Sequence, residues 1–83
     1  MTVRGRVQGV FYRDSVRRLA EGRGLAGSAT NEPDGSVVVV LEGPAGAVEE
    51  LIAFCAEGPD RAEVSAVEVE EQEPEGTTGF RTA

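Results

Sequence analysis

The stretch Gly5–Arg13 combines residue types that could hold a small anion. Glycines at positions 5 and 9 permit positive φ and close approach of the backbone to a ligand. If a helix begins directly after this loop, its first backbone N–H groups have no intrahelical partner and attract negative charge. Arg13, one turn in, could present a planar guanidinium to two phosphate oxygens. A glycine loop that merely turns the chain is the alternative, and the residues alone leave both open.

The same stretch excludes two familiar nucleotide sites, since it has neither the Gly-Lys-Ser/Thr of a Walker loop nor a dinucleotide fingerprint. The chain contains no histidine and so lacks the usual neutral-pH base. The nearest carboxylate, Asp14, is interpreted as an exposed first-turn residue that the helix dipole favours. Asn31, at the end of a weak strand pattern, either satisfies turn backbone groups or orients a ligand.

The charge of the chain is unevenly distributed. Residues 1–23 carry six arginines against two acidic residues, whereas residues 24–83 carry two arginines against 13 acidic residues, for a net charge of −7. A long polyanion would be repelled by most of this surface, so nucleic acid is not an expected partner. A small anion could still be attracted to the basic end.

Length and composition predict one soluble domain over residues 1–83. There is no apolar run of about 18 residues, as a membrane span needs, and no signal peptide is recognised, so we expect a cytoplasmic protein. The lone Cys55 cannot form an internal disulfide and no metal-ligand spacing surrounds it. It lies on an apolar helical stripe and is expected to be a core residue. Neither a metal nor a cofactor is expected.

Hydrophobic periodicity predicts two helices and five strands. The first helix runs from about Phe11 to a stop at Gly24, and the second lies between Pro44 and Gly58. The first presents an apolar face made of Tyr12, Val16, Leu19, Ala20 and Arg23. The second carries a stripe of Val48, Leu51, Ile52 and Cys55. The strands are expected at Val3–Arg6, Ala26–Asn31, Ser36–Glu42, Glu63–Glu70 and Gly79–Thr82.

The order β-α-β-β-α-β plus a terminal strand fits an α+β fold, the ferredoxin-like split βαβ sandwich. Its antiparallel sheet would carry both helices on one face. Val38 and Val40 should then point to the uncovered face. They could form a dimer contact, but β-propensity alone explains them equally well.

The motif Val3-x-Gly5-x-Val7-Gln8-Gly9-Val10-x-Tyr12-Arg13 resembles the N-terminal signature of the acylphosphatases. A second signature spans Gly27–Asn31, continues through Gly35-x-Val37 and ends at Gly43. The resemblance covers essentially the whole chain. Tyr12, Ser28 and Thr30 depart from the usual residues. The first strand begins late, so we expect a few residues to be missing before Met1.

This resemblance implies a hydrolase that cleaves acyl phosphates to a carboxylate and inorganic phosphate without a metal. Asn31 would orient the attacking water, and a phosphate oxygen of the substrate would take the proton of that water. The phosphate would be held by the Arg13 guanidinium and by the backbone N–H groups of Arg6, Val7, Gln8, Gly9 and Val10. No chemical role is assigned to the Gln8 side chain.

Two other function classes stay open at this point. The domain also resembles a piece of larger carbamoyl-transfer maturation proteins, which would make it a non-catalytic module that binds carbamoyl phosphate. It could instead be a protein-interaction domain that uses a sheet edge or its valine face. We expect a monomer that acts on a small molecule and does not bind membranes.

Overall fold

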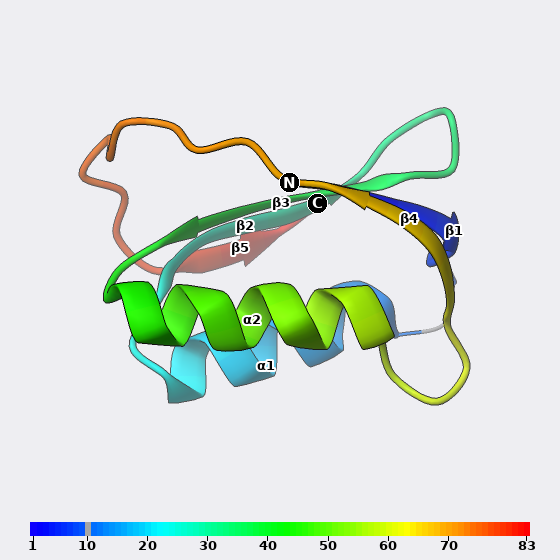
Figure 1. The fold of residues 1–83 in the computed structure, drawn as a ribbon, viewed down its shortest axis with the longest axis horizontal. Coiled ribbons are helices and arrows are strands. Elements are labelled where there is room, and N and C mark those ends of the chain that lie inside the picture. Colours follow the sequence, from blue (N-terminus) through cyan, green and yellow to red (C-terminus); the bar gives the residue numbers. More distant parts are fainter. Residues whose placement is uncertain (10) are drawn as a thin grey trace.

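A computed structural model describes residues 1–9 and 11–83 and shows two layers (Figure 1). Helices α1 (Tyr12–Gly22) and α2 (Ala45–Glu57) lie together on one face of a sheet. The sheet consists of β1 (Thr2–Arg6), β2 (Ala26–Asn31), β3 (Val37–Glu42), β4 (Glu63–Glu68) and β5 (Phe80–Thr82). The ferredoxin-like α+β fold is therefore confirmed. In these described ranges, no helix has the length and apolar character needed to cross a membrane.

The strand order is β4-β1-β3-β2-β5, and the first four strands pair antiparallel. The predicted antiparallel pairing is confirmed for these four strands, whereas the terminal strand β5 pairs parallel to β2 and makes the sheet mixed. The strands β4 and β5 lie at opposite edges of the sheet, so the chain must cross the sheet between them. The connection 69–79 does this by passing over the helix-free face (Figure 1).

The fourth strand is shorter than the sequence pattern predicts. It was expected to reach Glu70 but ends at Glu68. Glu68 is the partner of Thr2, the first residue of β1, so Val69 and Glu70 lie beyond the paired part of the ladder. The alternation of apolar and polar residues thus continues beyond the point where β4 has β1 beside it as a pairing partner.

The apolar stripes of the helices form the core as predicted, with two exceptions. Tyr12, Val16 and Ala20 of α1 are buried, and Leu51 and Cys55 of α2 are fully buried. They pack on the inward-facing residues of the sheet, which include Val3, Ala29, Val37 and Val39. One exception is Ile52, which is half-buried and does not belong to the core cluster. The other is Arg23, which follows the end of α1, is exposed and forms an ion pair with Glu50.

The opposite face of the sheet has no helix over it. Val40 is 40% exposed there and Val38 is half-buried, as the alternation predicts. Ser28 pairs with Val40 and Thr30 with Val38 in the β2–β3 ladder. Both departures from the second family signature therefore lie on the face turned away from the helices, where they do not alter the core.

A buried hydrogen bond of Tyr12 joins the two helices. Its hydroxyl donates to the carbonyl oxygen of Cys55 at 2.7 Å. This carbonyl lies in the last turn of α2, and the residue four positions on is Pro59, which has no N–H to donate. Tyr12 supplies the missing donor, which explains a tyrosine at this position. Burial raises the pKa of the Tyr12 hydroxyl and raises that of the Cys55 thiol to about 11, so the thiol is un-ionised at neutral pH.

We predict that Tyr12→Phe lowers the free energy of unfolding by about 1 to 3 kcal/mol, because it leaves the Cys55 carbonyl buried without a donor. Urea unfolding followed by circular dichroism measures the change. Thr78→Val is the matched control, since it removes an exposed hydroxyl and should change stability by less than about 0.5 kcal/mol. Equal stability of Tyr12→Phe and the wild type would contradict this role.

Candidate functional site

The loop between β1 and α1 begins at a strand irregularity. The β1–β4 register shifts between Arg4 and Gly5, and Gly5 has φ +128°. A Cβ at this position would collide with the backbone carbonyl oxygen of Glu63 on β4. Glycine is required here because the bulge brings the two backbones too close for a side chain.

The loop ends in two residues with left-handed backbone. Gly9 has φ +72° and Phe11 has φ 59° and ψ 22°. Phe11 occupies the N-cap of α1 with no side-chain cap among the described residues, and its carbonyl accepts from the N–H and hydroxyl of Ser15. Gly9 and Phe11 are therefore the described residues at which the chain turns from the loop into the helix. Val10, which the sequence analysis also assigns to the phosphate loop, lies outside the described residues.

A side chain fixes the loop to the distant β2–β3 hairpin. The Nε2 of Gln8 donates to the carbonyl oxygens of Glu32 and Ser36 at 2.8 and 2.9 Å. Glu32 directly follows Asn31, so this carboxamide joins the proposed phosphate loop to the end of the strand that carries Asn31. The sequence alone indicates no role for this side chain, and its two partners lie 24 and 28 residues away.

The hairpin has its own internal support. One carboxylate oxygen of Asp34 accepts from the Ser36 N–H at 2.9 Å and from the Ser36 hydroxyl at 2.6 Å. Arg4 lies 3.1 Å from the other oxygen. The hydrogen bonds from Ser36, and secondarily the one from Arg4, hold the pKa of Asp34 at about 2. This arrangement fixes Ser36, whose carbonyl receives Gln8.

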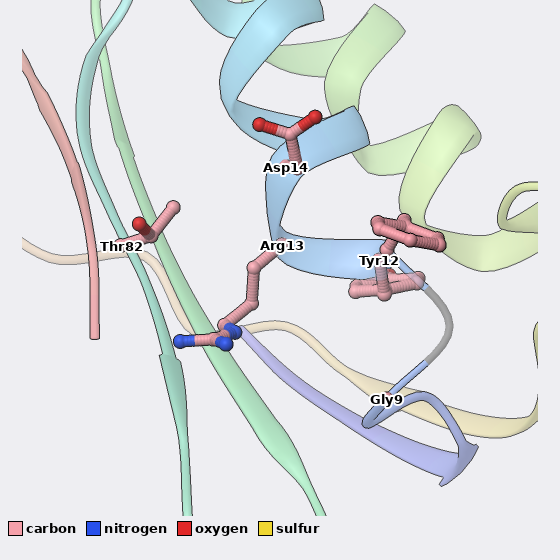
Figure 2. A pocket seen from close by; sticks show the side chains of 6 residues that line it. Gly9, Tyr12, Arg13, Asp14 and Thr82 are labelled. Atoms are coloured by element: carbon pink, nitrogen blue, oxygen red, sulfur yellow. The ribbon is translucent and has the colours of Figure 1, made fainter.

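A pocket of about 280 Å³ opens at the start of α1 (Figure 2). Its lining residues come from the loop, the first turn of the helix and β5. They are Gly9, Phe11, Tyr12, Arg13, Asp14 and Thr82. The Arg13 side chain leaves the helix start and extends toward the strands (Figure 2). Gly9 and Arg13, predicted to share an anion site, thus line one pocket.

The ion pairs of the basic segment leave Arg13 available. Arg4, Arg17, Arg18 and Arg23 all pair with carboxylates. Within the described residues, Arg13 pairs with none. A guanidinium without a carboxylate partner, at the N-terminus of a helix, can bind an external anion.

Asp14 also lines this pocket, and its interpretation as an exposed residue needs correction, since it is half-buried. Its carboxylate oxygens lie 2.6 Å from Arg17 and 2.9 Å from Arg18, and it points away from Arg13 (Figure 2). These contacts lower the pKa of Asp14, chiefly through the hydrogen bond from Arg17. They also balance its negative charge beside the pocket.

Asn31 ends β2 on the helix-covered side of the sheet. It follows the buried Ala29 by two residues, and alternate residues of a strand share a face. Its Oδ1 is buried and has no hydrogen-bond partner within the described part of the chain. Its N–H donates to the Ala83 carbonyl at 2.8 Å, next to Thr82 of the pocket. Asn31 itself is not among the lining residues.

Thr82 is a lining residue that the sequence analysis did not identify. Its strand pairs parallel to β2, with Thr82 opposite Ala29, so it faces the first turn of α1. Finding it from the sequence would have required knowing where the terminal strand pairs. The terminal strand is only three residues long and begins at Phe80, so its sequence pattern does not indicate which strand it pairs with.

Comparisons with known proteins point to one family. The family profile described as Acylphosphatase matches residues 1–82. An acylphosphatase of Rubrobacter xylanophilus is 57% identical over 74 residues, covering 89% of this chain and 67% of that relative. One from Haloarcula marismortui is 50% identical over 78 residues, covering 94% of this chain and 86% of its own.

Solved structures give the same result. The structure of an acylphosphatase from Coxiella burnetii superposes with a TM-score of 0.93 at 41% identity, covering 99% of this chain and 86% of the other. Full-length HypF, in a phosphate- and nucleotide-bound form, superposes with a TM-score of 0.89 at 26% identity. That match covers 99% of this chain but only 11% of HypF.

We predict that Gln8→Met, which keeps the length of the side chain but removes its donor, lowers the free energy of unfolding by about 1 to 3 kcal/mol. The cause is the loss of both hydrogen bonds to the hairpin. Urea titration measures the change, and Gln72→Met, in the exposed connection before β5, is the matched control. An equally small effect of both substitutions would show that the Gln8 carboxamide does not hold the loop.

A second prediction concerns acid stability. The pKa of Asp34 is lowered to about 2 from an unfolded value near 3.9, so its stabilisation is present above about pH 4 and is lost as the pH falls to about 2. The urea midpoint of Asp34→Asn should therefore lie below that of the wild type at pH 5, and the two midpoints should converge near pH 2. Arg4→Gln should retain most of the pH dependence, because Ser36 is the larger cause. Parallel wild-type and Asp34→Asn profiles would contradict this.

Proposed function

The chain belongs to the acylphosphatase family, and we propose that the pocket at the start of α1 is where it hydrolyses acyl phosphates. The enzyme cleaves the bond between carboxyl and phosphoryl groups and releases a carboxylate and inorganic phosphate. The observation that carries the assignment of the site is Arg13, a guanidinium that shares a pocket with Gly9 and pairs with no carboxylate in the described ranges.

The phosphate is bound by Arg13 and by the backbone N–H groups of the loop Arg6–Val10. A phosphoryl group in transfer carries its negative charge on equatorial oxygens, which suit a bidentate guanidinium and convergent amides. Because the transition state is loose, positioning and charge stabilisation account for most of the catalysis. The positive backbone angles at Gly9 and Phe11 support an inward-turned loop, since they change the chain direction beside Arg13.

Asn31 orients the attacking water. Its buried Oδ1 lacks a partner within residues 1–9 and 11–83, and a bound water would satisfy it. The β2–β3 hairpin supports this position, because Gln8 ties the residue after Asn31 to the phosphate loop. The phosphate loop and Asn31 are thereby held at a fixed separation.

The reaction needs no histidine. The water oxygen forms a bond to phosphorus while the bond from phosphorus to the acyl oxygen breaks, and its electron pair leaves with the carboxylate. One proton of the water stays on the new P–O group and the other moves to a phosphoryl oxygen of the substrate. A carboxylate is a good leaving group and requires no general acid.

We further propose that residues 1–83 act as one domain, as a monomer, in the cytoplasm and without a metal. The positive charge that stabilises the transition state comes from Arg13 and the loop amides. The net charge of −7 disfavours nucleic acid as a partner. The non-catalytic anion-binding alternative is not favoured, because relatives at 57% and 50% identity are acylphosphatases.

We predict that Arg13→Ala lowers kcat/KM for benzoyl phosphate by at least about 10³-fold and affects both kcat and KM, since it removes ground-state and transition-state contacts. Asn31→Ala should lower kcat by about 10²-fold or more with KM within about threefold, because its contact is with the water. The assay is substrate disappearance at neutral pH with a chelator present.

Arg81→Ala is the control, since it removes an exposed arginine on the strand that also carries Thr82, and its activity should stay within about twofold of the wild type. Circular dichroism must show that all variants fold. Small, equal losses in Arg13→Ala and Asn31→Ala would contradict the assignment. Loss of wild-type turnover on chelation would contradict the metal-free reaction.

A further inference from the structure

Phe11 is placed against several local preferences at once. It is 74% exposed, more than Val40 or Val69, the other exposed large hydrophobic side chains among the described residues. Its backbone φ of 59° lies in the left-handed region. Residues with a Cβ rarely adopt this conformation, and glycine and asparagine tolerate it best. It also occupies a helix N-cap, where serine, threonine, aspartate or asparagine would accept a hydrogen bond from the helix.

None of these costs is offset by packing of the ring in the core. The hydrophobic core includes its neighbour Tyr12 but not Phe11. The hydrogen bonds from Ser15 hold the Phe11 carbonyl, so the backbone conformation is fixed without help from the ring. Residues that break local rules in this way occur preferentially at functional sites.

The ring stands at the pocket that contains Arg13. Phe11 lines this pocket together with Gly9, Arg13 and Thr82. If Arg13 and the loop amides hold the phosphate, the acyl group of the substrate must project from the phosphate toward the mouth of the pocket. The exposed ring is the apolar surface there that is free to contact it. Apolar groups gain from burial against a ring, and aromatic pairs gain further from stacking or edge contacts.

We propose that Phe11 contacts the acyl group of the substrate and gives the enzyme a preference for aromatic and bulky apolar acyl phosphates over acetyl phosphate. The proposal rests on the function proposed above and deepens it, since it names the substrate class. Phe11 acts on the acyl half of the molecule, whereas Arg13 acts on the phosphate half. Its effect therefore depends on the acyl group and not on phosphate affinity.

The test compares kcat/KM for benzoyl phosphate and acetyl phosphate in the wild type and in Phe11 variants. Dividing each variant's ratio by the wild-type ratio cancels the different intrinsic reactivities of the two substrates. Phe11→Asn and Phe11→Ala both remove the ring, but asparagine tolerates the left-handed backbone and alanine does not. Phe11→Tyr keeps an aromatic ring. Val40→Ala, on the helix-free face, is the control for loss of an exposed apolar side chain.

The benzoyl-to-acetyl ratio is expected to fall at least about fivefold in both ringless variants and to stay within about twofold in Phe11→Tyr and Val40→Ala. Inhibition by inorganic phosphate should be unchanged throughout. An unchanged ratio in Phe11→Asn and Phe11→Ala would overturn the proposal. A loss in Phe11→Ala that Phe11→Asn does not share would also overturn it, because backbone conformation would then be the cause.

A binding measurement separates this proposal from the proposed function. Calorimetry with benzoylphosphonate and acetylphosphonate, which cannot be hydrolysed at the same bond, requires no turnover. The dissociation constant of benzoylphosphonate should rise at least about fivefold in Phe11→Asn while that of acetylphosphonate stays within about twofold. Absence of wild-type turnover with this pattern intact would refute the hydrolase site but not the role of Phe11. Equal affinity of the wild type for both phosphonates would refute the role of Phe11.

Discussion

The position of one loop, held by one carboxamide, is the constraint on which the site depends. Gln8 donates to two carbonyl oxygens of the β2–β3 hairpin and so connects the segment before Arg13 to the segment after Asn31. These segments are 24 and 28 residues apart in the sequence, one in the loop after β1 and the other in the turn between β2 and β3. A site that works mainly by positioning needs its two halves at a fixed separation. The hairpin can serve as a reference point because Asp34 and Ser36 already hold it in shape.

The electrostatics at the start of α1 depend on Arg13, which lines the pocket and has no carboxylate partner among the described residues. The helix that carries Arg13 also carries Asp14, whose charge would oppose an anion. Arg17 and Arg18, three and four positions further along the helix, pair with that carboxylate, which leaves Arg13 to the pocket. The net charge of −7 disfavours the approach of larger polyanions, whereas a small anion experiences mainly its immediate surroundings.

Much of the fold followed from periodicity, because buried stripes such as Tyr12, Val16 and Ala20 have the helical repeat. The pairing of Gly9 with Arg13 in one pocket also followed, since both belong to one continuous segment. What could not be predicted depends on distant contacts: the parallel placement of β5, the presence of Thr82 in the pocket and the hydrogen bonds of Gln8. The hydrogen bond from the Tyr12 hydroxyl to the Cys55 carbonyl, 43 residues away, also depends on a distant contact. It forms because Pro59 has no N–H to donate to that carbonyl.

The most direct test of the central claim is to map which backbone amides bind phosphate. In a ¹⁵N-labelled protein titrated with inorganic phosphate, we expect the largest amide shifts at Val7, Gly9 and the first turn of α1. Arg13→Ala should abolish these shifts while the rest of the spectrum stays unchanged. Shifts that centre instead on Arg4 or Arg23, or that persist in Arg13→Ala, would show that the anion binds elsewhere.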